Sequence, residues 1–301
     1  MQNVIAIIWD FDKTLINGYM QSPIFKDYNV DEKAFWTEVN NMPTQMKEKG
    51  IRVNPDTAYL IQFTRKAKDG TFKGLNNAKL REYGSKQSFY NGIPEFLQKT
   101  KSIFQDNPEC KEYNIRVEHY IISTGFAEVI KGTSLKNFVE DIWGCELIEG
   151  NGIDNEPVIS EICYTIDNTT KTKAIFEINK GVNKNTAINV NSKMSDAQRR
   201  VAFENMIYIA DGPSDVPAFS LVKKFGGSTF AIYPKGDERA FKQVEQLRED
   251  NRIDMFAEAD YTEGSTAYMW IVNKIKEYAD RIVQIERNSK AVIGEGPHHL
   301  I

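Results

Sequence analysis

The chain has 301 residues, of which 41% are hydrophobic and 27% are charged, a balance typical of a globular protein of about two domains. Its net charge of −4 argues against a dedicated nucleic-acid-binding protein, which would usually present a basic face. The 3 cysteines are too few and too scattered for a disulfide framework or a zinc site. The sequence has no apolar run of about 18 residues and no signal peptide at its start, so we expect a cytoplasmic protein without a membrane span.

The first predicted element is a strand over residues 4–9. Its continuous apolar sequence, VIAIIW, suits a strand that is buried on both faces of a parallel sheet. The following stretch, 17–88, carries no strong strand signal. Apolar residues recur there at helical spacing over 31–48 and 55–67, and 76–87 is a weaker helix candidate. We therefore predict a separate helical module over 17–88.

From about residue 90 the predicted elements alternate between helix and strand. The expected strands are 115–122, 145–149, 157–165, 206–210, 228–233 and 254–261, of which the second and third suit a hairpin. The expected helices are 94–104, 126–131, 134–141, 171–179, 216–224, 237–248 and 265–286. This alternation implies right-handed crossovers and helices on both faces of the sheet. The predicted fold class is therefore α/β, with a doubly wound, Rossmann-like parallel sheet and an inserted helical cap.

Two segments fall outside the alternation. Residues 182–204 are polar and without a clear period, so we expect an inserted loop or a small hairpin near the sheet edge. Residues 288–301 contain glycines, a proline and two histidines, and a frayed terminus is expected there rather than a metal site.

Acidic residues directly follow two of the predicted strands. Asp10 and Asp12 follow the first strand in WDFDKTL, and Asp211 and Asp215 follow the strand 206–210 in IYIADGPSD. Ligands bind at the carboxyl ends of strands in an open parallel sheet, so these four carboxylates should crowd together and need a cation. Hard oxygen ligands with room for water favour Mg²⁺. The alternative is that each pair makes turns and helix caps.

Two further groups complete the predicted site. Ser123 ends a third strand, and its hydroxyl, with the backbone N–H groups of Thr124 and Gly125, can hold a phosphoryl oxygen at the start of a helix. Lys173 lies in the first turn of a predicted helix, where the helix dipole disfavours a cation, so a functional cation is predicted there. The nearby alternatives are Lys171 and Lys180.

These residues together resemble the four motifs of the haloacid dehalogenase-like (HAD) phosphohydrolases. DFDKTL at 10–15 is similar to the DxDxT signature, Ser123 to the second motif, Lys173 to the third, and DGPSD at 211–215 to the fourth. The helical module stands where members similar to phosphoserine phosphatase carry a helical cap, and STGF at 123–126 resembles the SGGF of that branch. The resemblance implies a catalytic core over 1–16 and 89–301, with a cap over 17–88.

The resemblance also implies a mechanism. Asp10 would attack phosphorus to form an aspartyl-phosphate, and Asp12 would act as general acid and then as general base. Mg²⁺ would be held by Asp10, the main-chain carbonyl of Asp12 and Asp211, with Asp215 acting behind them or through water. The residues expected around the phosphoryl group are Thr14, Ser123, Thr124, Gly125 and Lys173.

The expected substrate is a small phosphorylated metabolite, because a lid of this size favours one over a phosphoprotein. Asp12 favours phosphate-ester hydrolysis over dehalogenation, which needs no proton donor. Phosphoserine phosphatases carry a Glu nine residues after the nucleophile, where this chain has Tyr19, so the resemblance does not extend to their substrate. Two alternatives stay open: phosphotransfer to an acceptor other than water, and a binding or regulatory protein that has kept the fold without turnover.

Overall fold

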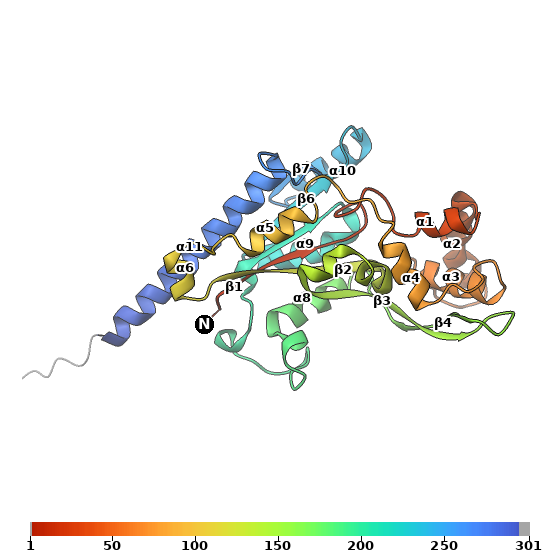
Figure 1. The fold of residues 1–301 in the computed structure, drawn as a ribbon, viewed down its shortest axis with the longest axis horizontal. Coiled ribbons are helices and arrows are strands. Elements are labelled where there is room, and N and C mark those ends of the chain that lie inside the picture. Colours follow the sequence, from red (N-terminus) through yellow and green to blue (C-terminus); the bar gives the residue numbers. More distant parts are fainter. Residues whose placement is uncertain (1, 295–301) are drawn as a thin grey trace, which may run out of the picture.

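The computed structural model describes residues 2–294, which are built around a seven-stranded sheet (Figure 1). The strands span β1 Val4–Trp9, β2 Arg116–Phe126, β3 Val139–Asn151, β4 Pro157–Tyr164, β5 Met206–Ala210, β6 Ser228–Tyr233 and β7 Met255–Glu258. Their order is β4-β3-β2-β1-β5-β6-β7. Every neighbouring pair is parallel except β3 and β4, which form an antiparallel hairpin. The predicted α/β class and the mostly parallel sheet are confirmed.

Helices cover both faces of this sheet (Figure 1). Those that follow residue 90 span α5 Glu95–Lys101, α6 Pro108–Glu112, α7 Ala127–Lys131, α8 Lys171–Lys180, α9 Val216–Lys224, α10 Glu238–Glu249 and α11 Thr266–Gly294. Trp9 contacts Phe96 of α5 on one face, and α11 packs beside α5. Tyr208 contacts Phe219 of α9 on the other face, and α8 packs beside α9. The sheet is thus buried on both sides, as the apolar sequence of β1 predicts.

The register of the sheet brings the ends of three strands to one level. β1 lies between β2 and β5, and Trp9 stands opposite Ile121 on one side and Ile209 on the other. The chain leaves β1 toward β2 and later returns to β5 on the opposite side. The junction of β1 and β5 is therefore the switch point of the strand order, where ligands bind in such sheets. Asp10 and Asp211 directly follow β1 and β5, and Ser123 lies within the last residues of β2, which extends to Phe126.

Two segments differ from the sequence prediction. The expected helix over 134–141 is instead a 3₁₀ turn, Ser134–Asn137, followed by β3 from Val139. The apolar residues there fit the spacing of a helix as well as that of a strand. The segment forms a strand because it pairs with β2. The polar segment 182–204 contains short 3₁₀ turns and no strand within the described chain, so the suggested small hairpin is wrong.

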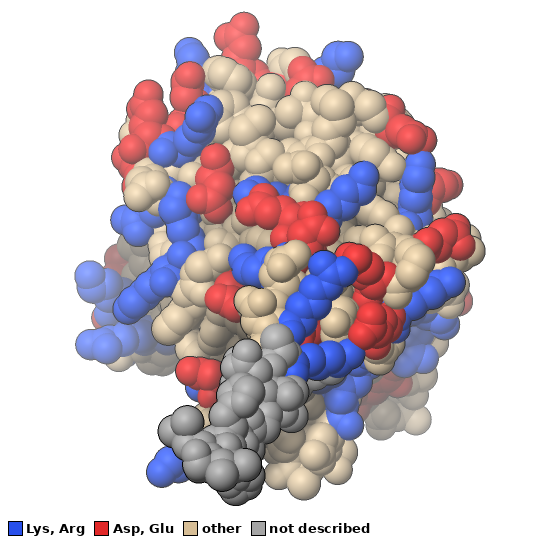
Figure 2. Space-filling model, turned by 90° about the vertical axis from the view of Figure 1, so that its left-hand side faces the viewer, with Lys and Arg blue, Asp and Glu red and all other residues tan. Residues whose placement is uncertain are grey.

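The last helix is longer than the sequence predicts. α11 continues to Gly294, so residues 288–294 are helical rather than frayed. Two ion pairs join this end of α11 to α6, Arg287 with Glu109 and Lys290 with Glu112. The remaining tail, 295–301, lies outside the described residues. Figure 2 views the side of the molecule where α11 ends and shows basic and acidic side chains interspersed over it. Across residues 2–294, none of the helices is long and apolar enough to cross a membrane.

Residues 17–88 form four helices held together by aromatic rings. These helices are α1 Ser22–Asp27, α2 Glu32–Lys47, α3 Ala58–Lys68 and α4 Asn77–Gly84. The ring centroids of Phe25, Phe35 and Phe63 lie 4.8–5.5 Å apart. Phe63 also lies 5.0 Å from Phe126 at the end of β2. The aromatic cluster therefore joins the helical segment to the strand that carries Ser123.

Two backbone contacts also attach the helical segment to the rest of the protein. At its base, Ile16 and Phe89 form an antiparallel bridge, so the chain enters and leaves side by side. At the far side, the N–H of Ile159 in β4 donates to the carbonyl oxygen of Leu75 at 2.8 Å. The β3–β4 hairpin therefore lies against the helical segment, as Figure 1 shows.

The helices α4 and α7 cross with their backbones in contact. A Cβ added to Gly132 would lie 1.9 Å from the carbonyl oxygen of Arg81, and one added to Gly84 would lie 2.3 Å from the carbonyl oxygen of Val129. Neither glycine has a positive φ. Both positions therefore require glycine because the crossing leaves no room for a methyl group.

Replacing Gly132 by alanine is expected to force α4 and α7 apart. The free energy of unfolding should fall by about 3 kcal/mol, near the upper end of the usual cost of overpacking. Urea denaturation followed by circular dichroism measures the change. Gly74→Asn is the control, because a Cβ at Gly74 meets nothing within 4 Å and asparagine tolerates its φ of +69°. A Gly132→Ala protein as stable as the control would contradict the close crossing.

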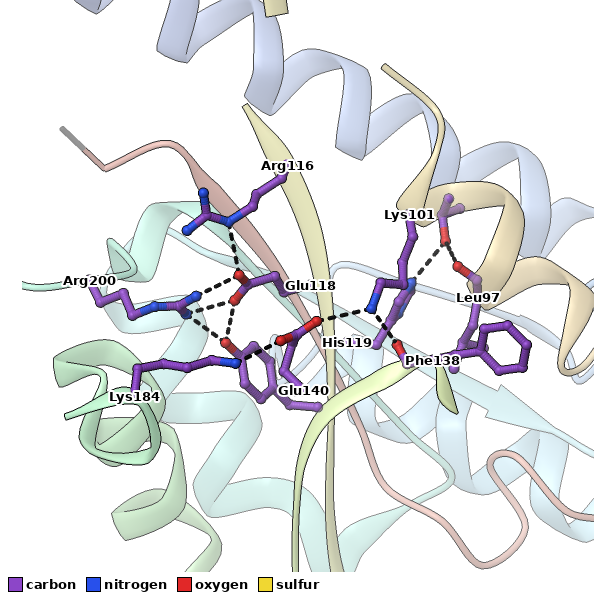
Figure 3. Close-up of polar contacts among 11 residues, drawn as sticks. Leu97, Lys101, Arg116, Glu118, His119, Phe138, Glu140, Lys184 and Arg200 are labelled. Carbon is purple, nitrogen blue, oxygen red and sulfur yellow. Dashed lines mark hydrogen bonds and ion pairs between the residues drawn. The ribbon is translucent and has the colours of Figure 1, made fainter. Parts of the chain in front are cut away.

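Ion pairs hold the 182–204 segment against the sheet (Figure 3). Glu118 of β2 is buried and accepts hydrogen bonds from both Nη atoms of Arg200 at 2.5 and 2.6 Å. Burial raises the pKa of Glu118, but the hydrogen bonds led by Arg200 outweigh it and hold the pKa below its usual value. Glu140 of β3 accepts from Lys184 at 2.7 Å. The polar insertion is thus anchored to two strands by charged groups.

His119 is a core residue of β2, as the sequence pattern predicts. Trp9 Nε1 donates to His119 Nδ1 at 3.1 Å, so the proton of the ring lies on Nε2, which is 2.9 Å from Thr100 Oγ1. Burial lowers the pKa of His119 to about 3, and Lys101 adds to the effect. Figure 3 shows this histidine beside the ion pairs of the neighbouring strands. The ring is therefore neutral and serves the core.

Candidate active site

Three carboxylates meet at the carboxyl ends of β1 and β5. Asp10 follows β1, Asp211 follows β5, and Asp215 precedes α9. One oxygen of each lies within 4.8 Å of the others. Asp10 and Asp215 are only 5% and 0% exposed, whereas Asp211 is partly exposed. The structure therefore brings together three of the four acids that the sequence places at these strand ends.

The lysine of this cluster is Lys171, and the prediction of Lys173 is wrong in this respect. Lys171 Nζ donates to Asp10 Oδ1 at 2.7 Å and to Asp215 Oδ1 at 2.6 Å, and its side chain is 1% exposed. Lys173 is 46% exposed and pairs with Glu177 on the outer face of α8.

Helical phase explains the difference between the two lysines. The buried residues of α8 include Lys171, Ala174, Ile175 and Ile178, which recur every three or four positions. Lys173 stands two residues after Lys171, on the far side of the helix. Extending the apolar stripe back by one turn would have pointed to Lys171 from the sequence alone.

Asp215 holds Lys171 in place. Its Oδ1 also accepts a hydrogen bond from the hydroxyl of Tyr208 at 2.6 Å, and its Oδ2 accepts from Ser214 at 2.9 Å. Both carboxylate oxygens therefore have protein donors. Tyr208 and Ser214 were not predicted from the sequence. Tyr208 lies in an all-apolar strand, where a tyrosine ordinarily indicates core packing.

Asp12 lies outside the cluster of three acids and contacts the start of the helical segment. Its Oδ1 accepts a hydrogen bond from the backbone N–H of Met20 at 2.9 Å. Thr14 lies in the same loop, and its hydroxyl donates to Asp10 Oδ2 at 3.1 Å. The carbonyl of Thr14 in turn accepts from the hydroxyl of Tyr261 at 2.7 Å. The loop after β1 is thus fixed from both sides.

A methionine covers the end of β2, where Ser123, Thr124 and Gly125 lie. The Ser123 hydroxyl oxygen accepts from the N–H of Gly125 at 3.0 Å, and the Thr124 carbonyl accepts from the hydroxyl of Tyr59 at 2.6 Å. A Cβ on Gly125 would lie 2.2 Å from the terminal methyl of Met20, which is fully buried. In this conformation the Gly125 N–H and the Ser123 hydroxyl oxygen are paired with each other, and the Met20 side chain lies against Gly125.

Burial and mutual repulsion shift the acids of the site. Burial raises the pKa of Asp10 to about 6; Lys171 opposes the shift and Asp215 adds to it. Burial, the charge of Asp10 and that of Asp215 raise the pKa of Asp211 to about 7. Burial followed by Asp10 raises the pKa of Asp12 well above its usual value. Crowded acids of this kind are stabilised by an added cation.

A cavity of about 460 Å³ opens onto Asp211. Lys13 and Tyr19 line it from the loop after β1, and Asp237 and Arg239 line it from the start of α10. Lys13 Nζ lies 4.3 Å from the centroid of the Tyr19 ring. The cavity gives solvent access to the partly exposed carboxylate of the cluster.

A known structure of the same fold supports this description of the architecture. A HAD family hydrolase from Salmonella enterica subsp. enterica serovar Typhi superposes with a TM-score of 0.50 at 16% identity, over 79% of this chain and 64% of that one. The chain therefore spans slightly less than two thirds of that protein. An apo phosphoserine phosphatase matches with a TM-score of 0.49 at 15% identity, over 84% of this chain and 92% of that one. The protein has the fold of the HAD superfamily.

Its relationship by sequence is more specific. No protein-family model matches the chain. A protein of Borreliella burgdorferi described as uncharacterized is 34% identical over 288 residues, which cover 91% of this chain and 97% of that protein. The chain belongs to the same family as this Borreliella protein.

Proposed function

We propose that this protein is a magnesium-dependent phosphatase that hydrolyses a small phosphorylated compound through an aspartyl-phosphate on Asp10. The observation that carries the proposal is the cluster of Asp10, Asp211 and Asp215 around Lys171, at the ends of adjacent strands in a HAD fold. Such a cluster provides a carboxylate nucleophile, and the cation beside it offsets the negative charge of a phosphoryl group.

The donor set of the cluster fits a divalent cation. Asp10 and Asp211 offer carboxylate oxygens, the hard ligands that Mg²⁺ prefers. Asp211 has no hydrogen-bond or ion-pair partner among the described residues, and burial, followed by the charges of Asp10 and Asp215, raises its pKa. We propose that these two residues and the main-chain carbonyl of Asp12 hold the ion. Bound there, Mg²⁺ would neutralise part of the charge of the phosphoryl group.

The neighbours of Asp10 orient it for attack. Its Oδ1 accepts from Lys171 and its Oδ2 from Thr14, so two donors restrict the rotation of the carboxylate. Lys171 also favours the ionised form that a nucleophile requires, against the effect of burial. Asp215 acts as a positioning residue, because it holds Lys171 beside Asp10.

Asp12 is the proposed general acid and base. Burial, followed by the charge of Asp10, raises the pKa of Asp12 and so favours the protonated carboxyl group, which suits protonation of the leaving-group oxygen. The resulting carboxylate then takes a proton from the water that hydrolyses the intermediate. Its hydrogen bond from Met20 ties the position of Asp12 to residues 17–88, which we propose to act as a cap over the site.

Hydrolysis of p-nitrophenyl phosphate by the purified protein, with MgCl₂ or with EDTA, tests the proposal directly. Turnover that requires Mg²⁺ is the expected result. Absence of turnover on this ester and on a panel of phosphorylated metabolites, by a folded protein that binds Mg²⁺, would overturn it.

Replacing Asp211 by asparagine is expected to abolish Mg²⁺ binding in isothermal titration calorimetry and to stabilise the metal-free protein at pH 8. The folded protein keeps a proton on Asp211 up to about pH 7, whereas the unfolded chain releases it near pH 4. The stability of the metal-free protein therefore falls as pH rises through this window. The variant lacks this penalty, so its free energy of unfolding should exceed that of the wild type by about 2 kcal/mol at pH 8. This value is discounted for the partial exposure of the side chain.

Urea unfolding at pH 4 and at pH 8 in EDTA separates the two effects. The difference in the free energy of unfolding between wild type and Asp211→Asn should be small at pH 4 and should appear at pH 8. A variant that binds Mg²⁺ like the wild type, or that is less stable than it at pH 8, would contradict the role given to Asp211.

A further inference from the structure

Two cationic side chains line the cavity beside Asp211 without an ion-pair partner in the part of the chain that the structure describes. Lys13 comes from the loop after β1, and Arg239 from the first turn of α10. Lys13 Nζ lies over the ring of Tyr19, and Arg239 is exposed. Asp237 on the same rim caps α10, where its Oδ1 accepts a backbone N–H at 2.9 Å. The cavity wall therefore carries two cations without an ion-pair partner, beside the carboxylates of Asp211 and Asp237.

Neither cation is well placed for the stability of the fold. Lys13 has a φ of +58°, a left-handed conformation that is unfavourable for a residue with a side chain. Arg239 stands in the first turn of α10, the end of a helix at which the dipole disfavours positive charge. Lys13 and Arg239 thus each occupy a position that is unfavourable for stability, and both line the same cavity. This combination indicates that both residues are there for function.

We propose that Lys13 and Arg239 bind a second anionic group on the substrate, a phosphate or a carboxylate on the part that leaves after phosphoryl transfer. The inference rests on the phosphatase function proposed above, since it assigns the cavity to the leaving group. A volume of about 460 Å³ suits a small molecule. The substrate class is therefore a compact compound with two anionic groups, such as a bisphosphate or a phosphorylated carboxylic acid.

The test compares substrates that differ by one charge. Phenyl phosphate is the reference, and 3-carboxyphenyl phosphate, 4-carboxyphenyl phosphate and 1,4-phenylene bisphosphate add an anionic group at different distances. For the wild type, kcat/KM should be at least about tenfold higher for one or more of the doubly anionic compounds. Lys13→Met and Arg239→Gln should each reduce this preference about tenfold or remove it, mainly through KM. The preference should also fall as NaCl is raised, because the contacts are between charges near solvent.

The readout is the ratio of kcat/KM for a doubly anionic substrate to kcat/KM for phenyl phosphate. A ratio is needed because Lys13 also acts on the charge of Asp211, so its loss can change the absolute rate. Lys235→Gln is the matched control. It removes one positive charge from the loop between β6 and α10, just before Arg239, but Lys235 does not line the cavity. This control should keep both the rate on phenyl phosphate and the preference of the wild type. A wild type without a preference, or a preference that survives in the Lys13→Met/Arg239→Gln double variant, would overturn the inference.

Calorimetric titration with non-hydrolysable ligands separates this inference from the phosphatase proposal. In the presence of Mg²⁺, 4-carboxybenzylphosphonate should bind the wild type about tenfold more tightly than benzylphosphonate, and the double variant should lose the difference. Hydrolysis without a preference would overturn the second anion site and leave the phosphatase function standing. A binding preference without hydrolysis of any ester would overturn the phosphatase function and support the anion site. Loss of both the hydrolysis and the binding preference would overturn the phosphatase function and the second anion site.

Discussion

Asp10→Asn is expected to lower magnesium-dependent turnover by about 10⁴-fold or more while leaving the protein folded. The amide cannot attack phosphorus, so no covalent intermediate forms. Asparagine keeps the shape of the side chain, and its oxygen can still accept the hydrogen bond from Lys171. Rapid acid quench followed by peptide mass spectrometry should find a phosphoryl group on the peptide with Asp10 in the wild type and none in the variant. A phosphoryl group on Ser123 or Asp211 would contradict the assignment.

Asp12→Asn is the matched comparison, because it also changes one carboxylate of the same loop to an amide. It keeps the nucleophile but cannot protonate the leaving group or activate water, so turnover should fall by about 10²–10⁴-fold. The loss should be smaller for aryl esters, whose leaving groups need little protonation. The aspartyl-phosphate should then accumulate, because its hydrolysis is slow. Near-wild-type turnover of Asp10→Asn would overturn the mechanism as a whole.

Lys171→Met is expected to reduce turnover by about 10³-fold, whereas Lys173→Met should change it by less than about twofold. Lys171 is the buried cation that contacts Asp10 and Asp215, and its removal takes positive charge from the place where the phosphoryl group would react. Lys173 is an exposed residue two positions along the same helix, so it controls for the effect of losing a lysine from α8.

Lys171→Met is also expected to destabilise the fold, by about 3–5 kcal/mol, because it leaves buried carboxylates without their partner. The double variant Lys171→Met/Asp215→Asn removes one of these charges as well. It should recover part of the stability, as measured by urea unfolding, without recovering turnover. Recovery of both would show that Lys171 acts only on the fold, and equal losses in Lys171→Met and Lys173→Met would contradict the geometry of the site.

The positions of the acids could be predicted from local sequence because they depend on strand ends. A buried parallel strand ends where polar residues begin, and the carboxyl ends of neighbouring strands share one edge of the sheet. Asp10 and Asp211 follow such strands directly, and they meet in the structure. The helical nature of 17–88 could be predicted for a similar reason, because the period of its apolar residues is read within one segment.

The choice of lysine depended on helical phase and on burial. Lys171 and Lys173 both lie in the first turn of the same predicted helix, and the motif spacing does not show which of them belongs to the site. The packing of α8 on the sheet turns Ala174 and Ile178 inward, and Lys171 follows them into the core. Counting back one helical turn from these residues leads to Lys171. How far toward the start of α8 the buried face extends, however, depends on the helix and the sheet that pack against it.

By itself the sequence determined the α/β architecture, the helical insertion and the acids at the strand ends, because each follows from periodicity or from residues adjacent along the chain. Only the tertiary structure decided the contacts made across the chain. These include the Tyr208 hydroxyl on Asp215, Met20 over the end of β2, and the glycine crossing of α4 and α7. The physical reason is that these contacts join residues from separate elements, and their distances depend on how the packed helices and strands fill space together.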